Sequence, residues 1–556
     1  MIKIKSFVAD SLEIVLCLYG VIQYLFGKTA GLKTLKKING INIIFVLLSI
    51  IFSLISLILL TILLLPLAAY KKVVSIYLKS KYKDDFGEML EGIDNLWAIE
   101  TKQSRHIINA LMYIEYNDSK ESIMARIYEV FKEKLVYQFT CVRKRELGYY
   151  FRLLNRIKPE DLISKWNLSD EELSNKDAFE DALRKISNQP MPINDTACFQ
   201  LLASMVPITF SPSCNNNNGN SKKVYPIMLR IHHSVGDGVA LLSFLLKNVS
   251  DEKINVEEEI VKRIMKNNTK PPKKNNLSSY VTKVIDTIKK ISNLNVYYFA
   301  PIENRDQNCL HGPSLSGKQI LTSYLEENPV YVNKIKSIKK RIPGCSFSDV
   351  ILTAISASFH EYFTKYAEEV PETMCLSFIL KRFDKNLNYT VTYDGKKEFD
   401  LGNHFSMGML KLPIRINVND PKKPLQERLY KVKEESEKIR NSVDILLYYW
   451  QLKFFTNLLP APVLNLIMKL NETVTTSFSN LPGIEGVHIK GYKVKDIVFW
   501  VPPVRSIGIG LSILTYDNRF QMGLLADEIL ISKRHKAQSV LNNIIKHIDD
   551  IDNELK

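Results

Sequence analysis

Two adjacent histidines, followed by an aspartate between two glycines, are the residues of this chain best suited to chemistry. They lie in Arg230–Gly238, which reads Arg-Ile-His-His-Ser-Val-Gly-Asp-Gly. An imidazole has an ordinary pKa near 6.5, so it can take and return a proton at physiological pH. A single histidine here would most simply be structural, but an adjacent pair with Asp237 is a much rarer pattern. It predicts acid–base catalysis at His232 or His233.

The histidines stand where a strand is expected to pass into a helix. Tyr225–Ile231 is a short apolar run bounded by turn signals and predicts a buried strand. Val239–Leu246 is dense in Leu and Val and predicts a buried helix. Because successive side chains of a strand point to opposite faces, we expect one histidine to face a cleft and the other to pack or brace. Gly236 and Gly238 permit a tight reversal between the two elements.

Other elements are expected to surround this turn. Ile107–Ile114 and Cys198–Phe210 predict strands, and Ser122–Phe139 predicts an amphipathic helix. Strands that feed one turn, with helices beside them, are typical of an α/β or α+β sandwich.

The composition narrows the class of protein. The chain has 556 residues, is 46% hydrophobic and carries a formal charge of +16, which favours a large core in more than one domain. The lysines are spread out and no nucleic-acid-binding motif occurs, so nucleic acid is not expected as a partner. An anionic membrane surface or cofactor fits the charge better. Seven widely separated cysteines, with no Cys-x-x-Cys pair, predict neither a disulfide framework nor a metal site, and indicate a cytosol-facing part.

The amino-terminal part reads as a membrane anchor. No charged residue lies between Lys37 and Lys71, and residues 41–69 are long and apolar enough to cross a bilayer with tilt. Val8–Phe26 is a weaker candidate because two acidic residues interrupt it; it fits a second span, one arm of a hairpin or an interfacial helix. Lysines flank the strong span on both sides, so the orientation stays open.

Changes in composition suggest the domain organisation. Lysines cluster with Pro271 and Pro272 in a segment expected to be an exposed crossover or linker. The predicted parts are a membrane anchor over 1–83, a first domain with the histidine motif over 84–250, a Lys-rich crossover or linker over 251–300 and a second domain over 301–556.

The histidine motif fits His-His-x-x-x-Asp-Gly, the signature of the CoA-dependent acyltransferase superfamily. After it, the chain resembles the wax ester synthase/diacylglycerol acyltransferase family over roughly Asp94 to Leu530. The motifs that carry this resemblance follow in the family's order: Asn308–Lys318, Ser346-Phe347-Ser348-Asp349-Val350 with the small-residue helix Ile351–Phe359, Leu401–Phe405 with Leu412-Pro413, Ser479–Gly483, and Ser512–Tyr516 with Ala526-Asp527.

The chain departs from the family pattern in three places. The Pro-Leu-Trp tripeptide is missing, and its nearest counterpart is Pro192-Ile193-Asn194. The Asn of the family's Asn-Asp-Val box is Ser348, whose single hydroxyl must substitute for an amide. The long apolar amino terminus is absent from bacterial members and suggests a membrane-tethered eukaryotic branch.

The resemblance implies an α/β fold of two chloramphenicol-acetyltransferase-like sandwich domains, which form a pseudo-dimer with a tunnel between them, preceded by a transmembrane helix or hairpin. It implies that His233 is the general base and that His232 supports it. Asp237 is tempting as a triad acid, but the family suggests that it pairs with an arginine and holds the turn.

The expected substrate site draws on both halves of the chain. Gly238 would let the backbone pass close to substrate, and Ser348 with backbone amides would face the oxyanion. Asp349 and Asn403 complete the expected substrate-binding residues.

The function implied is transfer of a fatty acyl group from acyl-CoA to a long-chain alcohol or diacylglycerol, with no further cofactor. The protein would be bound to a membrane, the endoplasmic reticulum first and otherwise the lipid droplet or plasma membrane, with the catalytic part in the cytosol. Two alternatives stay open: an acyltransferase for a small alcohol or amine, and a catalytically dead lipid-binding protein. The missing tryptophan and Ser348 keep the second alternative open.

Overall fold

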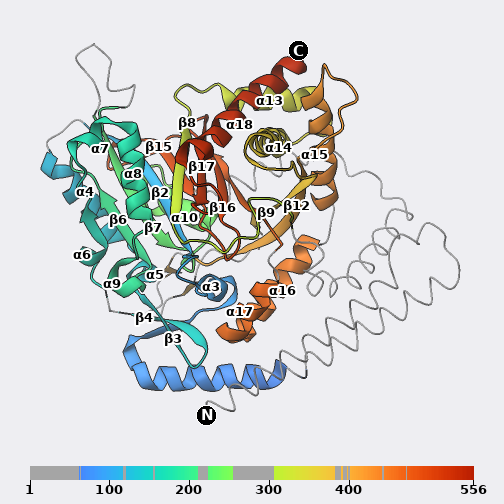
Figure 1. Ribbon diagram of the computed structural model, residues 1–556. Coiled ribbons are helices and arrows are strands. Elements are labelled where there is room, and N and C mark those ends of the chain that lie inside the picture. The colour runs from blue at the N-terminus through green and yellow to red at the C-terminus, as the bar shows by residue number, and fades with distance from the viewer. Residues whose placement is uncertain are drawn as a thin grey trace, which may run out of the picture.

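The computed structural model describes most of the chain after the predicted anchor. The described residues are 62, 64–116, 120–154, 157–210, 223–254, 306–381, 390–391, 397–398, 401–440, 444–470 and 473–556. The first of them form a helix over 64–82, the blue rod along the lower edge of Figure 1. No helix within these ranges is long and apolar enough to cross a membrane. The predicted segment 8–26 lies outside the described residues. So does the predicted span 41–69, apart from residues 62 and 64–69, and so does the predicted linker 251–300, apart from residues 251–254.

A six-stranded mixed sheet carries the histidine motif. Its order is β14 (His488–Ile489), β15 (Tyr492–Trp500), β2 (Ile107–Tyr116), β7 (Lys223–His232), β6 (Phe199–Ala203) and β5 (Ile163–Lys165). All neighbours are antiparallel except β5 and β6. The side chains of β7 after Lys223 are all buried, because both faces of this central strand are covered.

A second six-stranded mixed sheet is formed by the other half of the chain. Its order is β12 (Phe405–Pro413), β9 (Thr373–Lys381), β13 (Thr476–Ile484), β16 (Ile509–Tyr516), β17 (Arg519–Asp527) and β8 (Gln319–Leu325). Strand β13 runs parallel to both β9 and β16, and the other pairs are antiparallel. The two sheets lie side by side in the middle of the molecule, with helices around them (Figure 1).

Smaller strands and the helices complete the fold. Two small sheets are β1 (Phe86–Met89), β4 (Tyr149–Leu153) and β3 (Val142–Glu146), and the ribbon of β10 (Thr390–Val391) and β11 (Lys397–Glu398). The helices of the first half are α3 (Gly92–Trp97), α4 (Lys120–Lys134), α5 (Tyr137–Thr140), α6 (Pro159–Leu162), α7 (Asp170–Ser174), α8 (Lys176–Ser187), α9 (Pro192–Asp195) and α10 (Gly238–Phe244), which continues as a π-turn over Leu245–Val249. Those of the second half are α13 (Tyr331–Arg341), α14 (Phe347–Tyr366), α15 (Pro424–Arg440), α16 (Asp444–Leu458), α17 (Ala461–Leu470) and α18 (Arg534–Glu554).

The two halves are joined by a shared core and by strand exchange. Strands β14 and β15 lie within the second half of the sequence but complete the first sheet, where β15 pairs with β2. Trp500 at the end of β15 is fully buried, and its indole N–H donates to the Thr322 carbonyl of β8 at 2.8 Å. A buried indole with a satisfied N–H fixes two elements relative to each other. Residues far apart in the sequence are therefore held rigidly where the sheets meet.

The mixed α/β class predicted from the sequence is confirmed, and two predicted elements need correction. The expected strand Cys198–Phe210 is only Phe199–Ala203. After Ala203 the Ser204 hydroxyl bonds the backbone of Val206 in a local turn, and beyond it Ile208 forms only an isolated bridge with Val224. The expected helix Ser122–Phe139 is two helices, α4 and α5, because Leu135 and Val136 leave the helical conformation between them.

Candidate active site

The two histidines occupy different surroundings at the end of β7. His232 is the last residue of the strand, and its N–H donates to the Cys198 carbonyl of the neighbouring segment at 2.9 Å. His233 lies one residue beyond, and its N–H donates to the His106 carbonyl at 2.8 Å. The backbone then turns into α10, whose N-cap is Asp237. Both rings are buried, but the cavity described below is lined by His233 and not by His232.

Asn403, from the second half of the chain, fixes the tautomer of His233. The Asn403 amide nitrogen donates to the Asp94 carboxylate and to the His233 carbonyl, each at 2.7 Å. Both partners are acceptors only, so the amide oxygen is the atom that lies 3.1 Å from Nδ1 of His233. Nδ1 therefore carries the proton and donates it to this oxygen. The lone pair is left on Nε2, the nitrogen that a general base must present.

A tryptophan covers one face of the same imidazole. The rings of Trp97 and His233 are stacked, with centroids 3.8 Å apart and an interplanar angle of 11°. Trp97 ends α3, and this short helix is tied to α16 through Gly92 and Asn457 and through Asn95, which donates to the Thr456 carbonyl at 2.9 Å. The stack excludes water from one face of the imidazole and restricts its rotation.

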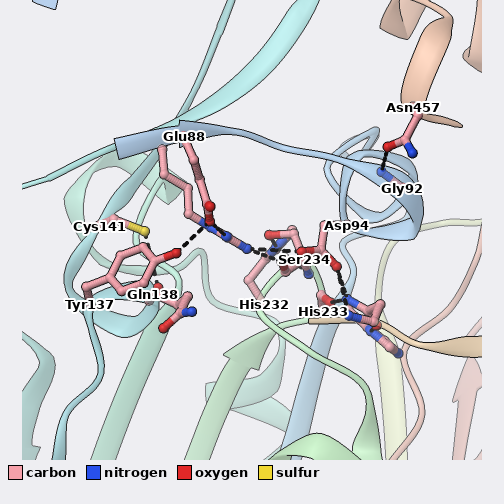
Figure 2. Close-up of polar contacts among 12 residues, drawn as sticks. Glu88, Gly92, Asp94, Tyr137, Gln138, Cys141, His232, His233, Ser234 and Asn457 are labelled. Carbon is pink, nitrogen blue, oxygen red and sulfur yellow. Dashed lines mark hydrogen bonds and ion pairs between the residues drawn. The ribbon is translucent and has the colours of Figure 1, made fainter. Parts of the chain in front are cut away.

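Asp94 connects the histidine to a larger polar network (Figure 2). Its carboxylate accepts from Asn403 and pairs with Arg152 at 3.3 Å. Arg152 also donates to the Ser234 carbonyl at 2.6 Å and pairs with Glu88. Burial raises the pKa of Asp94 to about 6, although Arg152 and the Asn403 hydrogen bonds oppose the rise. Two strands of the small sheet, β1 and β4, thereby supply the groups that hold the turn.

Burial lowers the pKa of both histidines. The pKa of His233 falls to about 4, mainly because its protonated form would be desolvated. The pKa of His232 falls to about 3, first through burial and then through the nearby Arg143 guanidinium. His233 is therefore neutral, and able to accept a proton, throughout the physiological pH range.

His232 is held within an ionic cluster that does not reach the cavity. Its Nδ1 lies 2.7 Å from the Ser234 hydroxyl, and its Nε2 lies 3.0 Å from a Glu100 carboxylate oxygen. Arg143 pairs with Glu100 at 2.8 Å. Burial alone would raise the pKa of Glu100, but His232 and Arg143 hold it well below its usual range. This arrangement fixes the position of the strand end beneath His233.

Asp237 holds the turn to both halves of the molecule. One carboxylate oxygen accepts from the Ala240 N–H at 2.8 Å and caps α10. The other accepts from the His404 N–H at 3.0 Å, across to the second half. Gly236 lies so close to the Leu401 backbone that any Cβ would overlap its carbonyl oxygen. Position 236 is variable in the motif, but this chain requires glycine there because the two backbones meet at this point.

A cavity of about 490 Å³ opens beside His233, between the two sheets. Its lining combines His233, Asp237 and Gly238 with residues of the second half, including Phe405, Asn480 and Leu481. The walls are mostly apolar, and their polar groups gather at Ser479, Asn480 and Thr515. A mostly apolar pocket with a few convergent polar groups is the usual form of a small-molecule site.

The remaining predicted residues lie behind this cavity rather than in its lining. Asn403 acts through His233. Ser348, in the first turn of α14, accepts from the Asn480 side chain at 3.4 Å, which is a long hydrogen bond. Asp349 is fully buried, caps α14 in a reciprocal box with Ser346 and pairs with Arg440 at 2.8 Å. Contact of Ser348 or Asp349 with substrate stays a prediction.

Two residues of the site escaped the sequence interpretation, Asp94 and Trp97. The tripeptide Pro192-Ile193-Asn194 was the nearest counterpart of the missing Pro-Leu-Trp, but it forms α9, whose residues do not line the cavity. Leu96-Trp97 instead places an indole against the catalytic imidazole candidate. The available signal was the Leu-Trp pair itself, in a chain with four tryptophans. Within the described residues, no cluster of three or more His, Cys, Asp or Glu side chains is arranged to hold a metal ion.

Residues 401–549 match the model of the WS/DGAT C-terminal domain, that is, of the wax ester synthase/diacylglycerol acyltransferase family. No curated protein sequence matches significantly.

Solved structures resemble the chain in fold at low sequence identity. The wax ester synthase/diacylglycerol acyltransferase from Marinobacter aquaeolei is 12% identical with a TM-score of 0.52, covering 83% of this chain and 99% of that one. The trichothecene 15-O-acetyltransferase from Fusarium sporotrichioides is 11% identical with a TM-score of 0.55, covering 83% and 94%. The first condensation domain of the calcium-dependent antibiotic synthetase is 10% identical with a TM-score of 0.51, covering 84% and 97%.

The matched domain family indicates an enzyme of the acyltransferase class, and the mixed α/β fold is similar to the folds of two solved acyltransferases. Within that class, the matched carboxyl-terminal domain confirms the resemblance to the wax ester synthase/diacylglycerol acyltransferase family that the motifs predicted.

Proposed function

We propose that this protein transfers a fatty acyl group from acyl-CoA to the hydroxyl of a long-chain alcohol, of diacylglycerol, or of both. The observation that carries the proposal is the fixed orientation of His233. Asn403 accepts the Nδ1 proton, so the basic nitrogen is Nε2, and the ring lines an apolar cavity. An alcohol is un-ionised at neutral pH, so its attack on a thioester requires a base in this position.

In the proposed reaction His233 removes the hydroxyl proton as the acceptor oxygen forms a bond to the thioester carbon. Collapse of the tetrahedral intermediate breaks the carbon–sulfur bond, and the same proton goes to the CoA sulfur. No covalent acyl-enzyme is needed. The imidazolium that forms in between is stabilised by the face of Trp97 and by the hydrogen bond to Asn403, which Asp94 supports. Asn480 and Ser479, which line the cavity with His233, are the nearest side-chain candidates for oxyanion donors.

The wider proposal concerns architecture and location. The two halves form a pseudo-dimer of chloramphenicol-acetyltransferase-like domains, and acyl-CoA and acceptor enter a tunnel between them from opposite ends. Acyl-CoA is a co-substrate, and no additional cofactor is required. The protein is bound through its amino terminus to a membrane, that of the endoplasmic reticulum, with the site on the cytosolic side. The apolar walls of the cavity and the partitioning of both acceptors into bilayers support this arrangement.

The test is an assay of microsomes from cells that express the chain, with labelled acyl-CoA and hexadecanol or diacylglycerol offered separately. We expect His233→Ala to lower ester formation by about 10² to 10⁴. The control is His488→Ala, since His488 lies at the edge of the first sheet and does not line the cavity. Ester formation that is unchanged in His233→Ala would show that His233 is not the base. Labelled product from a short-chain alcohol alone would instead favour the small-acceptor alternative.

A further inference from the structure

The helix over 64–82 has one buried face and an exposed face that is apolar. Its buried side chains include Leu64, Val74 and Leu78, which pack on the rest of the protein. On the other side Leu65, Val73 and Ile76 are 60%, 63% and 61% exposed. These residues recur at intervals of three or four, together with Ala69, so they form one stripe along the helix. Such a stripe is unusual on a surface that meets only water.

Neighbouring exposed side chains extend the apolar stripe. Tyr70 and Tyr77 continue the apolar surface, at 42% and 45% exposed. The Tyr70 hydroxyl donates to the carbonyl of Leu147, an exposed leucine at the tip of the β3–β4 hairpin. We call Leu65, Tyr70, Val73, Ile76, Tyr77 and Leu147 the outer apolar face.

Lysines border the outer apolar face on both sides. Lys72 and Lys79 are exposed and lie on one side of the stripe, about two helical turns apart. Lys81 lies on the other side, where Glu146 pairs with it. An apolar stripe between lysines is the pattern of a helix that lies in the plane of a membrane interface, where apolar side chains enter the acyl region and lysines meet phosphate groups.

The sequence before the helix also indicates that a membrane lies against this face. The chain has no charged residue from position 38 to position 70, and this uncharged stretch runs directly into the helix. A segment of that kind is expected in a bilayer, and the helix over 64–82 contains the residues at which the predicted span 41–69 ends and the chain would leave the bilayer. We infer that the outer apolar face lies in the interface of a bilayer with anionic headgroups, as a second membrane contact beside the predicted anchor. This contact would hold the globular part of the protein in one orientation on the membrane.

The first experiment measures depth rather than binding, because the predicted anchor over 41–69 would hold the chain on vesicles in any case. The full chain with Ile76→Cys carries a fluorophore and is reconstituted in phosphatidylcholine–phosphatidylserine vesicles whose phosphatidylcholine bears a nitroxide near the headgroup. We expect most of the fluorescence to be lost. The matched control is Ile529→Cys, which is 53% exposed and lies between β17 and α18. Helix α18 lies on the opposite side of the molecule from the helix over 64–82 (Figure 1). The unsubstituted chain, treated identically, gives the signal of the native cysteines.

Equal quenching at both positions would overturn the inference. So would a dimer in detergent that is lost in the double variant Val73→Asp/Ile76→Asp, because the face would then be an interface between two copies of the chain. Stronger quenching with phosphatidylserine than without it supports the role of the lysines.

A second experiment links the face to turnover. Val73→Asp/Ile76→Asp should lower acyl transfer severalfold to hexadecanol in vesicles but leave transfer to a water-soluble alcohol unchanged, whereas Ile529→Asp should alter neither. Equal loss with both acceptors would indicate damage to the fold and count against the inference. If the unsubstituted chain transfers no acyl group at all, the proposed function fails, while the quenching result still decides the membrane contact.

Discussion

Two aspartates stand at the starts of two buried helices, one in each half of the molecule. Asp237 is the N-cap of α10 and also binds the His404 backbone. Asp349 lies in the first turn of α14, where it accepts from the N–H of the N-cap Ser346 and pairs with Arg440. Both belong to sequence motifs that carry the family resemblance. The carboxylate oxygens of both accept hydrogen bonds from backbone N–H groups, and Asp349 also forms an ion pair. The difference lies beside them: the first turn carries His233 into the cavity, whereas the second carries Ser348 behind Asn480.

Asp237, the aspartate in the same motif as His233, is therefore not the carboxylate that supports the imidazole. The carboxylate that reaches His233, through the amide of Asn403, belongs to Asp94. The second half supplies the amide and much of the cavity wall, and the first half supplies the histidine that we propose as the base. Substitutions in each half should therefore separate loss of catalysis from loss of stability.

The largest expected effect, after removal of His233 itself, is that of Asn403→Leu. This variant removes the acceptor for Nδ1 and the donation to the His233 carbonyl, two hydrogen bonds worth about 1 kcal/mol each. Their loss corresponds to a fall in kcat/KM of about thirtyfold. Asn403→Asp is the informative partner, because it keeps the acceptor for Nδ1 but sets a second carboxylate against buried Asp94. Activity in Asn403→Leu close to that of the unsubstituted enzyme would contradict the assignment of the tautomer.

Trp97→Ala should have a smaller effect that depends on pH. Burial is the main reason that the pKa of His233 lies at about 4, and removal of the indole lets water reach the ring. The pKa should then rise toward 6.5, so that part of His233 becomes protonated as the pH falls through 6. We expect the ratio of variant to unsubstituted kcat/KM to fall between pH 8 and pH 5.5. Trp97→Phe, which keeps an aromatic face, should shift the acid limb less; an identical limb in Trp97→Ala would refute the role of the stack.

Asp349→Ala should affect stability rather than chemistry. It leaves the Ser346 N–H without its acceptor and breaks the Arg440 pair in a buried setting. We expect the free energy of unfolding to fall by about 1–3 kcal/mol, measured by denaturant titration in detergent, with kcat retained in the folded fraction. A specific loss of kcat at unchanged stability would move Asp349 into the catalytic site.

Ser348→Ala should have the smallest effect. The hydroxyl accepts one long hydrogen bond from Asn480, and loss of about 0.5 kcal/mol changes kcat/KM roughly twofold. A tenfold loss with either acceptor alcohol would show that Ser348 contacts the reacting groups, as its place in the family motif suggests.

Residue types and spacing alone predicted the class of protein, which the matched family model supports, and a candidate chemistry. The adjacent histidines, the glycine-bounded Asp237 and the order of the later motifs are local patterns, and local patterns of residue type and spacing are what a sequence displays. The predicted ends of the strand before the histidines and of the helix after them each differ from the observed ends by no more than two residues. Hydrophobic patterning specifies these elements. The apolar pattern of the amino-terminal part likewise predicts a membrane anchor, although nearly all of that part lies outside the described residues.

Only the tertiary structure decided how the histidine is held. Asn403 is 170 positions from His233 and 309 from Asp94, and the exchange of β14 and β15 into the first sheet determines how the two halves meet. Contacts at such separations depend on the packing of whole sheets, which no local pattern encodes. The same packing placed Trp97 on the imidazole.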